Sequence, residues 1–366
     1  MHQGSTETTP HTAVAAWGMA LAAIFLAALL AGGCQGSISE GEISQEGRMG
    51  ASGVERQKWV PLVSDPVVSP WKTPLGPGRA LETQHYRIFT TVNDRQMLRI
   101  FPAFMEAAYD NYYVITRLPR IAPGKKMPVY FMADRNQWVS LTEYHFGKDI
   151  GAFLDIPTGG YSHQGVGVFW QLQGMQSYSI ASHEGLHQFL YYRMRNTLPA
   201  WLEEGLCTMA EGFQDRQAEA VRFTPEENIS RATDLQAVIV NDRWIPLEKL
   251  LNMDSAEAIS KGNDPLAFYA QVWALAMYLR YDKNYSARLQ TLLTDAAAGT
   301  FHKALGVPQE KLSQLQQHKG YNPTVAVPLF RYYFANNLAG FEKAYRNYAE
   351  RNLIKLLPKN PVLKDY

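Results

Sequence analysis

The sequence predicts an α+β fold in which a sheet-bearing first half is followed by a helical second half. Two observations lead to this prediction. Between residues 86 and 172, strand-like runs alternate with helical patterns. After Gly174, apolar residues recur with the helical period of 3.6 up to the C-terminus, apart from loops.

Composition excludes several classes of protein. The 366 residues include 35 Lys plus Arg and 34 Asp plus Glu, so the net charge of +1 provides no basic surface for nucleic acid. An aromatic content of 12% is too high for a disordered chain. With only Cys34 and Cys207 present, no disulfide framework can hold the fold. Stability must come from a core, and the chain is long enough to bury one.

The N-terminal segment resembles a bacterial lipoprotein signal peptide. Apolar or small residues run without a break from Ala13 to Ala31 and are followed closely by Cys34, the expected site of lipidation. We therefore expect residues 1–33 to be a signal peptide and the rest of the chain to lie in the cell envelope, held at a membrane by a lipid. The alternative is an uncleaved transmembrane anchor, because about 20 apolar residues can span a bilayer.

Residues 34–80 are predicted to be a flexible tether. This segment is rich in Gly, Ser and Pro, and such a composition cannot repay the entropy of ordering by burial. Folded structure is expected for residues 81–355, as a sheet-bearing lobe (81–195) and a helical lobe (196–355). Residues 356–366 remain as a tail.

Within the first lobe, each element follows from its own pattern. Strands are expected at 86–92, 127–132, 151–156 and 165–172, with a helix between the first two. Asp134 is a suitable cap for a second helix. Residues 213–241 are expected to form a long connection.

The most informative motif is HExxH, formed by His183, Glu184 and His187. It lies in a helical pattern, where residues four apart are on the same face, so both imidazoles can reach one metal ion. Glu184 projects beside them and is suitably placed to accept a proton from water.

A catalytic zinc requires a third protein ligand. Residues 198–206, Leu-Pro-Ala-Trp-Leu-Glu-Glu-Gly-Leu, predict a second helix with Pro199 in its first turn. Either Glu203 or Glu204 could face the two histidines from this helix, and the spacing leaves the choice open. Cys207 is most simply a small buried hydrophobic residue.

HExxH followed by Trp-Leu-Glu-Glu-Gly resembles the gluzincins, the thermolysin-like zinc metallopeptidases. More narrowly, residues 82–355 resemble the peptidase-MA-like domains of uncharacterised bacterial lipoproteins. The resemblance implies a thermolysin-like fold and one Zn²⁺ on His183, His187 and Glu204. It also implies that Glu184 is the general base and that Tyr269 stabilises the oxyanion. Related enzymes orient a histidine with a carboxylate four residues beyond the glutamate ligand; Thr208 stands there, so Glu211 is the expected substitute.

These features together predict zinc-dependent hydrolysis of peptide or protein substrates. The strand at 165–172 is expected at the edge of the cleft, where it would pair with the substrate backbone. A lipid-anchored binding or envelope protein that retains the fold without activity is the alternative. Residues 151–155 lack the Glu-Asn pair that binds the substrate amine in the aminopeptidase branch of the gluzincins, so the sequence does not favour aminopeptidase over endopeptidase activity.

Overall fold

The computed structural model describes residues 57–73, 75–122, 124–147, 150–154, 156, 159–316 and 321–357. The predicted signal peptide, Cys34 and the first part of the tether lie outside these residues, as does most of the predicted tail. Among the helices in the described ranges, none combines the length and the apolar character needed to cross a bilayer.

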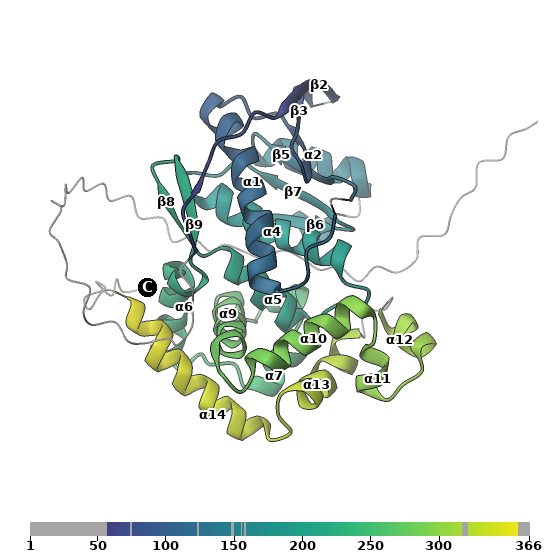
Figure 1. Cartoon of the computed structure of the whole chain (residues 1–366), viewed down its shortest axis with the longest axis vertical. Coiled ribbons are helices and arrows are strands. Elements are labelled where there is room, and N and C mark those ends of the chain that lie inside the picture. The colour runs from purple at the N-terminus through teal and green to yellow at the C-terminus, as the bar shows by residue number, and fades with distance from the viewer. Residues whose placement is uncertain are drawn as a thin grey trace, which may run out of the picture.

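The predicted α+β class is confirmed. Figure 1 shows a sheet-bearing lobe above and a group of helices below. The strands are β1 (Val60–Pro61), β2 (Val67–Thr73), β3 (Gly76–Glu82), β4 (Tyr86–Thr90), β5 (Met127–Met132), β6 (Gly160–His163), β7 (Val166–Trp170), β8 (Phe213–Arg216) and β9 (Ala220–Phe223). The helices are α1 (Arg95–Thr116), α2 (Arg135–Phe146), α3 (Gly151–Leu154), α4 (Gln176–Arg193), α5 (Ala200–Ala210), α6 (Ile229–Val240), α7 (Leu247–Asn252), α8 (Ser255–Ile259), α9 (Pro265–Tyr281), α10 (Ser286–Ala298), α11 (Phe301–Leu305), α12 (Gln309–Gln316), α13 (Tyr321–Tyr333) and α14 (Leu338–Tyr348).

The larger sheet has six strands in the order β2-β3-β4-β5-β7-β6. Its centre, β4-β5-β7, is parallel, and both flanks are antiparallel. Helix α1 makes the crossover from β4 to β5 and is capped by Asp94, whose side chain accepts hydrogen bonds from the backbone of Gln96 and Met97. Asp134 caps α2 as predicted. A smaller sheet has the order β1-β9-β8.

The tether prediction is wrong from residue 60 onward, because β1, β2 and the start of β3 lie in that segment. Its prolines are compatible with strands where they stand. Pro70 lies in β2, an edge strand that pairs only with β3, and Pro77 lies beyond the part of β3 that pairs with β4. Trp71 packs on Phe89 and Tyr130, which anchors the segment to the sheet.

Two strand predictions also need correction. Residues 151–154 form the short helix α3 instead of a strand. The strand predicted at 165–172 exists as β7, but it lies between β5 and β6 and not at an edge. Its Val-Gly-Val-Phe-Trp sequence is mostly buried, as expected for an interior strand. The edge strand is β6, so any pairing with a substrate at this edge would involve β6.

Helices α4 and α5 lie between the two lobes. One side of α4 packs on β6 and β7, and its other sides pack on α1 and α5. Gly205 lets α5 approach α9 closely, since a Cβ at this position would lie 2.7 Å from the Val272 carbonyl oxygen. This contact brings the helix that carries Glu204 against the helix that carries Tyr269.

Candidate metal centre

The two histidines of the motif lie in the middle of α4. They are four residues apart on one helix face, and their ring centroids are 5.0 Å apart. His183 is fully buried and His187 is 5% exposed. The prediction that both imidazoles face one point is therefore supported by the position of their rings.

Helix α5 places Glu204 between these rings. Its Oε2 lies 3.3 Å from the Nε2 of His183 and 3.7 Å from the Nε2 of His187. Donor atoms bound to one tetrahedral Zn²⁺ at about 2.0–2.3 Å stand about 3.3–3.8 Å apart, so these distances suit a shared ion. None of the three atoms has a hydrogen-bond partner, although all are buried. Buried polar atoms are rarely left unpaired, so this arrangement is suited to holding a metal cation.

Glu203 lies on a different side of His187 from Glu204. The spacing in the sequence left open which of the two glutamates would face both histidines, and in the structure Glu204 does so. Its Oε1 lies 2.8 Å from the Nδ1 of His187, the ring nitrogen that faces away from Glu204. A carboxylate on Nδ1 fixes the tautomer and the ring orientation of a metal-binding histidine. Glu203 thus contacts His187 on the side opposite to Glu204, a contact that the spacing in the sequence did not predict.

Glu211 has the corresponding position beside His183, as predicted. Its Oε1 lies 2.8 Å from the Nδ1 of His183. Thr208 is engaged elsewhere, because its hydroxyl donates to the carbonyl oxygens of Glu204 and Gly205 in its own helix. Each histidine therefore has a carboxylate on Nδ1, while its Nε2 faces Glu204.

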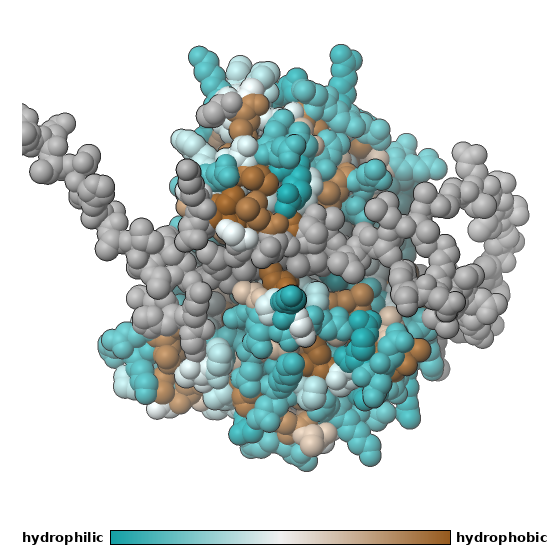
Figure 2. All heavy atoms as spheres, turned by 180° about the vertical axis from the view of Figure 1, so that it is seen from behind, coloured by the Kyte–Doolittle hydropathy of each residue, from teal (hydrophilic) through white to brown (hydrophobic). Residues whose placement is uncertain are grey.

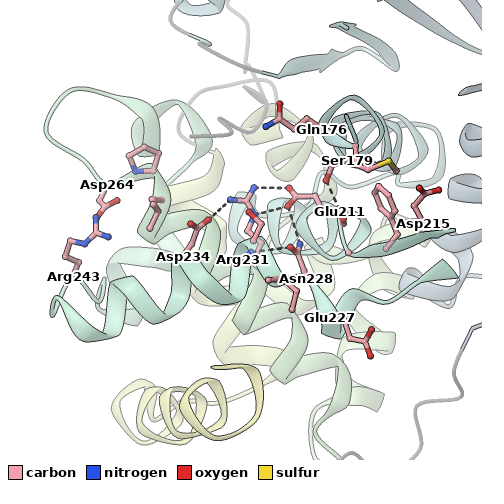
Figure 3. A pocket seen from close by; sticks show the side chains of 17 residues that line it. Gln176, Ser179, Glu211, Asp215, Glu227, Asn228, Arg231, Asp234, Arg243 and Asp264 are labelled. Carbon is pink, nitrogen blue, oxygen red and sulfur yellow. Dashed lines mark hydrogen bonds and ion pairs between the residues drawn. The ribbon is translucent and has the colours of Figure 1, made fainter. Parts of the chain in front are cut away.

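A buried arginine holds Glu211 in place. The Arg231 guanidinium donates from Nε to Oε2 of Glu211 at 2.8 Å and from Nη2 to Oε1 at 3.0 Å. The amide of Asn228, which also caps α6, contacts the same carboxylate at 3.4 Å. Figure 3 shows these side chains meeting at Glu211. Both residues come from the 213–241 segment, which was predicted to be a connection but contains β8, β9 and α6.

No local pattern in the sequence pointed to Arg231, Asn228 or Ser255. The hydroxyl of Ser255, at the start of α8, donates to Oε1 of Glu204 and so occupies the carboxylate oxygen that does not face the histidines. These partners belong to helices far from the HExxH motif in sequence. They are revealed only by the tertiary structure, in which α6 and α8 pack on α9, and α9 packs on α5.

Glu184 and Tyr269 are buried near the same group. Glu184 is 1% exposed, its Oε2 has no hydrogen-bond partner, and burial raises the pKa of its carboxyl to about 7. Tyr269 lies in the second turn of α9, which begins at the capping residue Asp264. The hydroxyl of Tyr269 is also buried without a partner, and its ring lies 5.4 Å from the Arg231 guanidinium carbon.

The electrostatic field at the centre favours positive charge. Burial would lower the pKa of His183, but the neighbouring carboxylates of Glu204 and Glu211 outweigh that effect and raise the pKa to about 8. Burial would raise the pKa of Glu204, but the two histidines hold it well below its usual range. A site that stabilises a proton on an imidazole also stabilises a metal cation at the same nitrogen.

Cys207 also belongs to this group. Ligand atoms of His183, His187 and Cys207 all lie within 4.8 Å of one another, and all three residues are buried, so they could hold a metal ion. Cys207 is thus buried as predicted, but its thiol lies beside the two histidines and does more than fill space in the core.

Two cavities flank the centre. One, of about 320 Å³, is lined by His187, Glu203 and the turn after β6. The other, of about 450 Å³, is lined by Glu211, Arg231 and the first turn of α4 (Figure 3).

On the face opposite to that of Figure 1, the described surface is largely hydrophilic, with hydrophobic residues in small groups (Figure 2).

No family model, curated protein or solved structure matches the chain.

Proposed function

We propose that this protein is a zinc-dependent peptidase of the gluzincin type. The observation that carries the proposal is the convergence of three buried atoms without hydrogen-bond partners: Nε2 of His183, Nε2 of His187 and Oε2 of Glu204. Two imidazoles and one carboxylate are a typical ligand set for a catalytic zinc. Bound there, Zn²⁺ would supply Lewis acidity, which polarises a carbonyl group and makes water a better nucleophile.

The other residues have roles that follow from their positions. Glu184 would accept a proton from the attacking water and pass it to the leaving amine. The hydroxyl of Tyr269 would donate a hydrogen bond to the carbonyl oxygen as negative charge develops there. Glu203 and Glu211 would hold the imidazoles in orientation, with Arg231 and Asn228 holding Glu211.

The location of this activity is a proposal from the sequence. The resemblance of residues 1–34 to a lipoprotein leader supports lipidation at Cys34 and an action on peptides or proteins in the cell envelope.

Metal content and peptide cleavage test the proposed function together. The purified chain is expected to contain one zinc per molecule and to cleave members of a mixed peptide library, since the ligands and the base are all present. A chelator should abolish cleavage, and added zinc should restore it. Failure to bind zinc stoichiometrically would refute the proposal. Zinc binding without cleavage would favour the non-catalytic binding protein.

Tyr269→Phe separates a catalytic hydroxyl from a structural one. We expect kcat to fall about 10²-fold, as for the loss of one oxyanion donor. Stability should change by less than about 0.5 kcal/mol, because the hydroxyl has no hydrogen bond to lose. Tyr345→Phe is the matched control: that buried hydroxyl donates to the Gln271 carbonyl oxygen, so stability should fall by about 1 kcal/mol with kcat preserved. Equal kcat in the Tyr269→Phe and native proteins would remove Tyr269 from the mechanism.

A further inference from the structure

The thiol of Cys207 lies beside the ligand atoms of the candidate centre. Cys207 is three residues after Glu204 on α5, so the two side chains lie on neighbouring positions of one helix face. Cys207 is fully buried. Its sulfur and one ring nitrogen of each histidine are within 4.8 Å of one another.

Burial alone does not explain this position. A cysteine that only fills space can have purely apolar neighbours, whereas this one adjoins buried polar atoms that lack partners. Three atoms of the centre are buried without a hydrogen-bond partner: Nε2 of His183, Nε2 of His187 and Oε2 of Glu204. A cation held by the two imidazoles would lie near the sulfur, because the sulfur and one ring nitrogen of each histidine are within 4.8 Å of one another.

We propose that Cys207 is a fourth protein ligand of the metal, a role that rests on the proposed metal centre. On binding, the thiol loses its proton to the buffer and a sulfur–metal bond forms, with no change in oxidation state. The donor set becomes two imidazole nitrogens, one carboxylate oxygen and one thiolate. A thiolate favours Zn²⁺, Co²⁺ and Cd²⁺ over Mg²⁺ and Ca²⁺, which prefer oxygen ligands.

Four protein ligands have a functional consequence. A tetrahedral zinc with four protein donors has no open position, whereas a catalytic zinc keeps one. With Cys207 as a ligand the resting centre would therefore be closed, so hydrolysis would require Cys207 to release the ion.

Cobalt substitution tests the proposal. The full chain, loaded with Co²⁺, is expected to show an intense near-ultraviolet sulfur-to-cobalt band in addition to weaker visible bands. Cys207→Ser and Cys207→Ala should lose the near-ultraviolet band and keep the visible ones, which arise from cobalt on the histidines and Glu204. Zinc competition should show a dissociation constant that is about tenfold higher or more in Cys207→Ser, since serine is a much weaker ligand.

The chain offers a matched control, because Cys34 is the other cysteine in the sequence. Cys34→Ser should retain the near-ultraviolet band. If native protein binds Co²⁺ and shows visible bands but no sulfur band, the role of Cys207 is refuted and the metal centre stands. If native protein binds neither Co²⁺ nor Zn²⁺, the proposed function itself fails. A sulfur band that persists in Cys207→Ser would also refute the proposal.

Discussion

Glu184→Gln is expected to lower kcat/KM for peptide hydrolysis by about 10³–10⁴-fold, within the range that general acid–base catalysis contributes. Glutamine has nearly the same shape, but it cannot accept the proton of the attacking water. Metal binding should persist, because the proposed ligands are His183, His187 and Glu204. The measurement is kcat/KM on a peptide selected from the library, with zinc content determined on the same sample.

A glutamate outside the centre provides the control for this variant. Glu248 is largely exposed and pairs with Arg331 on the surface. Glu248→Gln should keep the native kcat/KM. Native activity in Glu184→Gln would show that Glu184 is not the base, and loss of zinc from this variant would show that its role is structural.

Arg231→Met is expected to destabilise the protein by about 3–5 kcal/mol, the usual cost of leaving one partner of a buried ion pair without the other. The side chains of Arg231 and Glu211 are 4% and 1% exposed, so water cannot replace the lost hydrogen bonds. Zinc affinity should fall about 10–100-fold, because Glu211 would no longer be held on Nδ1 of His183. Urea unfolding and zinc competition measure the two effects.

A double variant tests the cause of that loss. Glu211→Gln combined with Arg231→Met removes both charges of this pair but leaves Asp234, the second partner of Arg231, without it, so part of the lost stability should return. Arg331→Met, which breaks an exposed ion pair with Glu248, should change stability by less than about 1 kcal/mol. A cost of similar size in Arg331→Met, or no recovery in the double variant, would contradict the explanation based on an uncompensated buried charge.

Much of the candidate centre was visible in the sequence. The separation of His183 and His187 by four residues places them on one helix face whatever the rest of the fold, because the helical repeat is fixed by backbone geometry. Glu211 was also expected, and the structure places it on Nδ1 of His183. Local periodicity predicted β4, β5, α2 and α4, since their apolar faces follow regular patterns.

The incorrect predictions about the fold concern segments whose structure is decided by long-range pairing and not by their local sequence pattern. Residues 67–80 have the composition of a linker, yet they form strands because pairing with the edge of the sheet satisfies their backbone groups and Trp71 packs on the sheet. Whether β7 or β6 lies at the edge depends on the order of strands. That order is a property of long-range pairing and has no signature within either strand.

The sequence alone was enough to predict the α+β class, the helical position of His183, Glu184 and His187, and the pair of glutamates that includes the proposed third ligand. Tertiary structure decided that Glu204 faces the two Nε2 atoms while Glu203 contacts Nδ1 of His187. It also decided that Arg231 and Cys207 join the group. The physical reason is that spacing along a helix fixes the direction of a side chain relative to its own helix only. The partner of that side chain depends on how α5 packs against α4 and α9 and how α6 packs against α9, and this packing is set by the whole core.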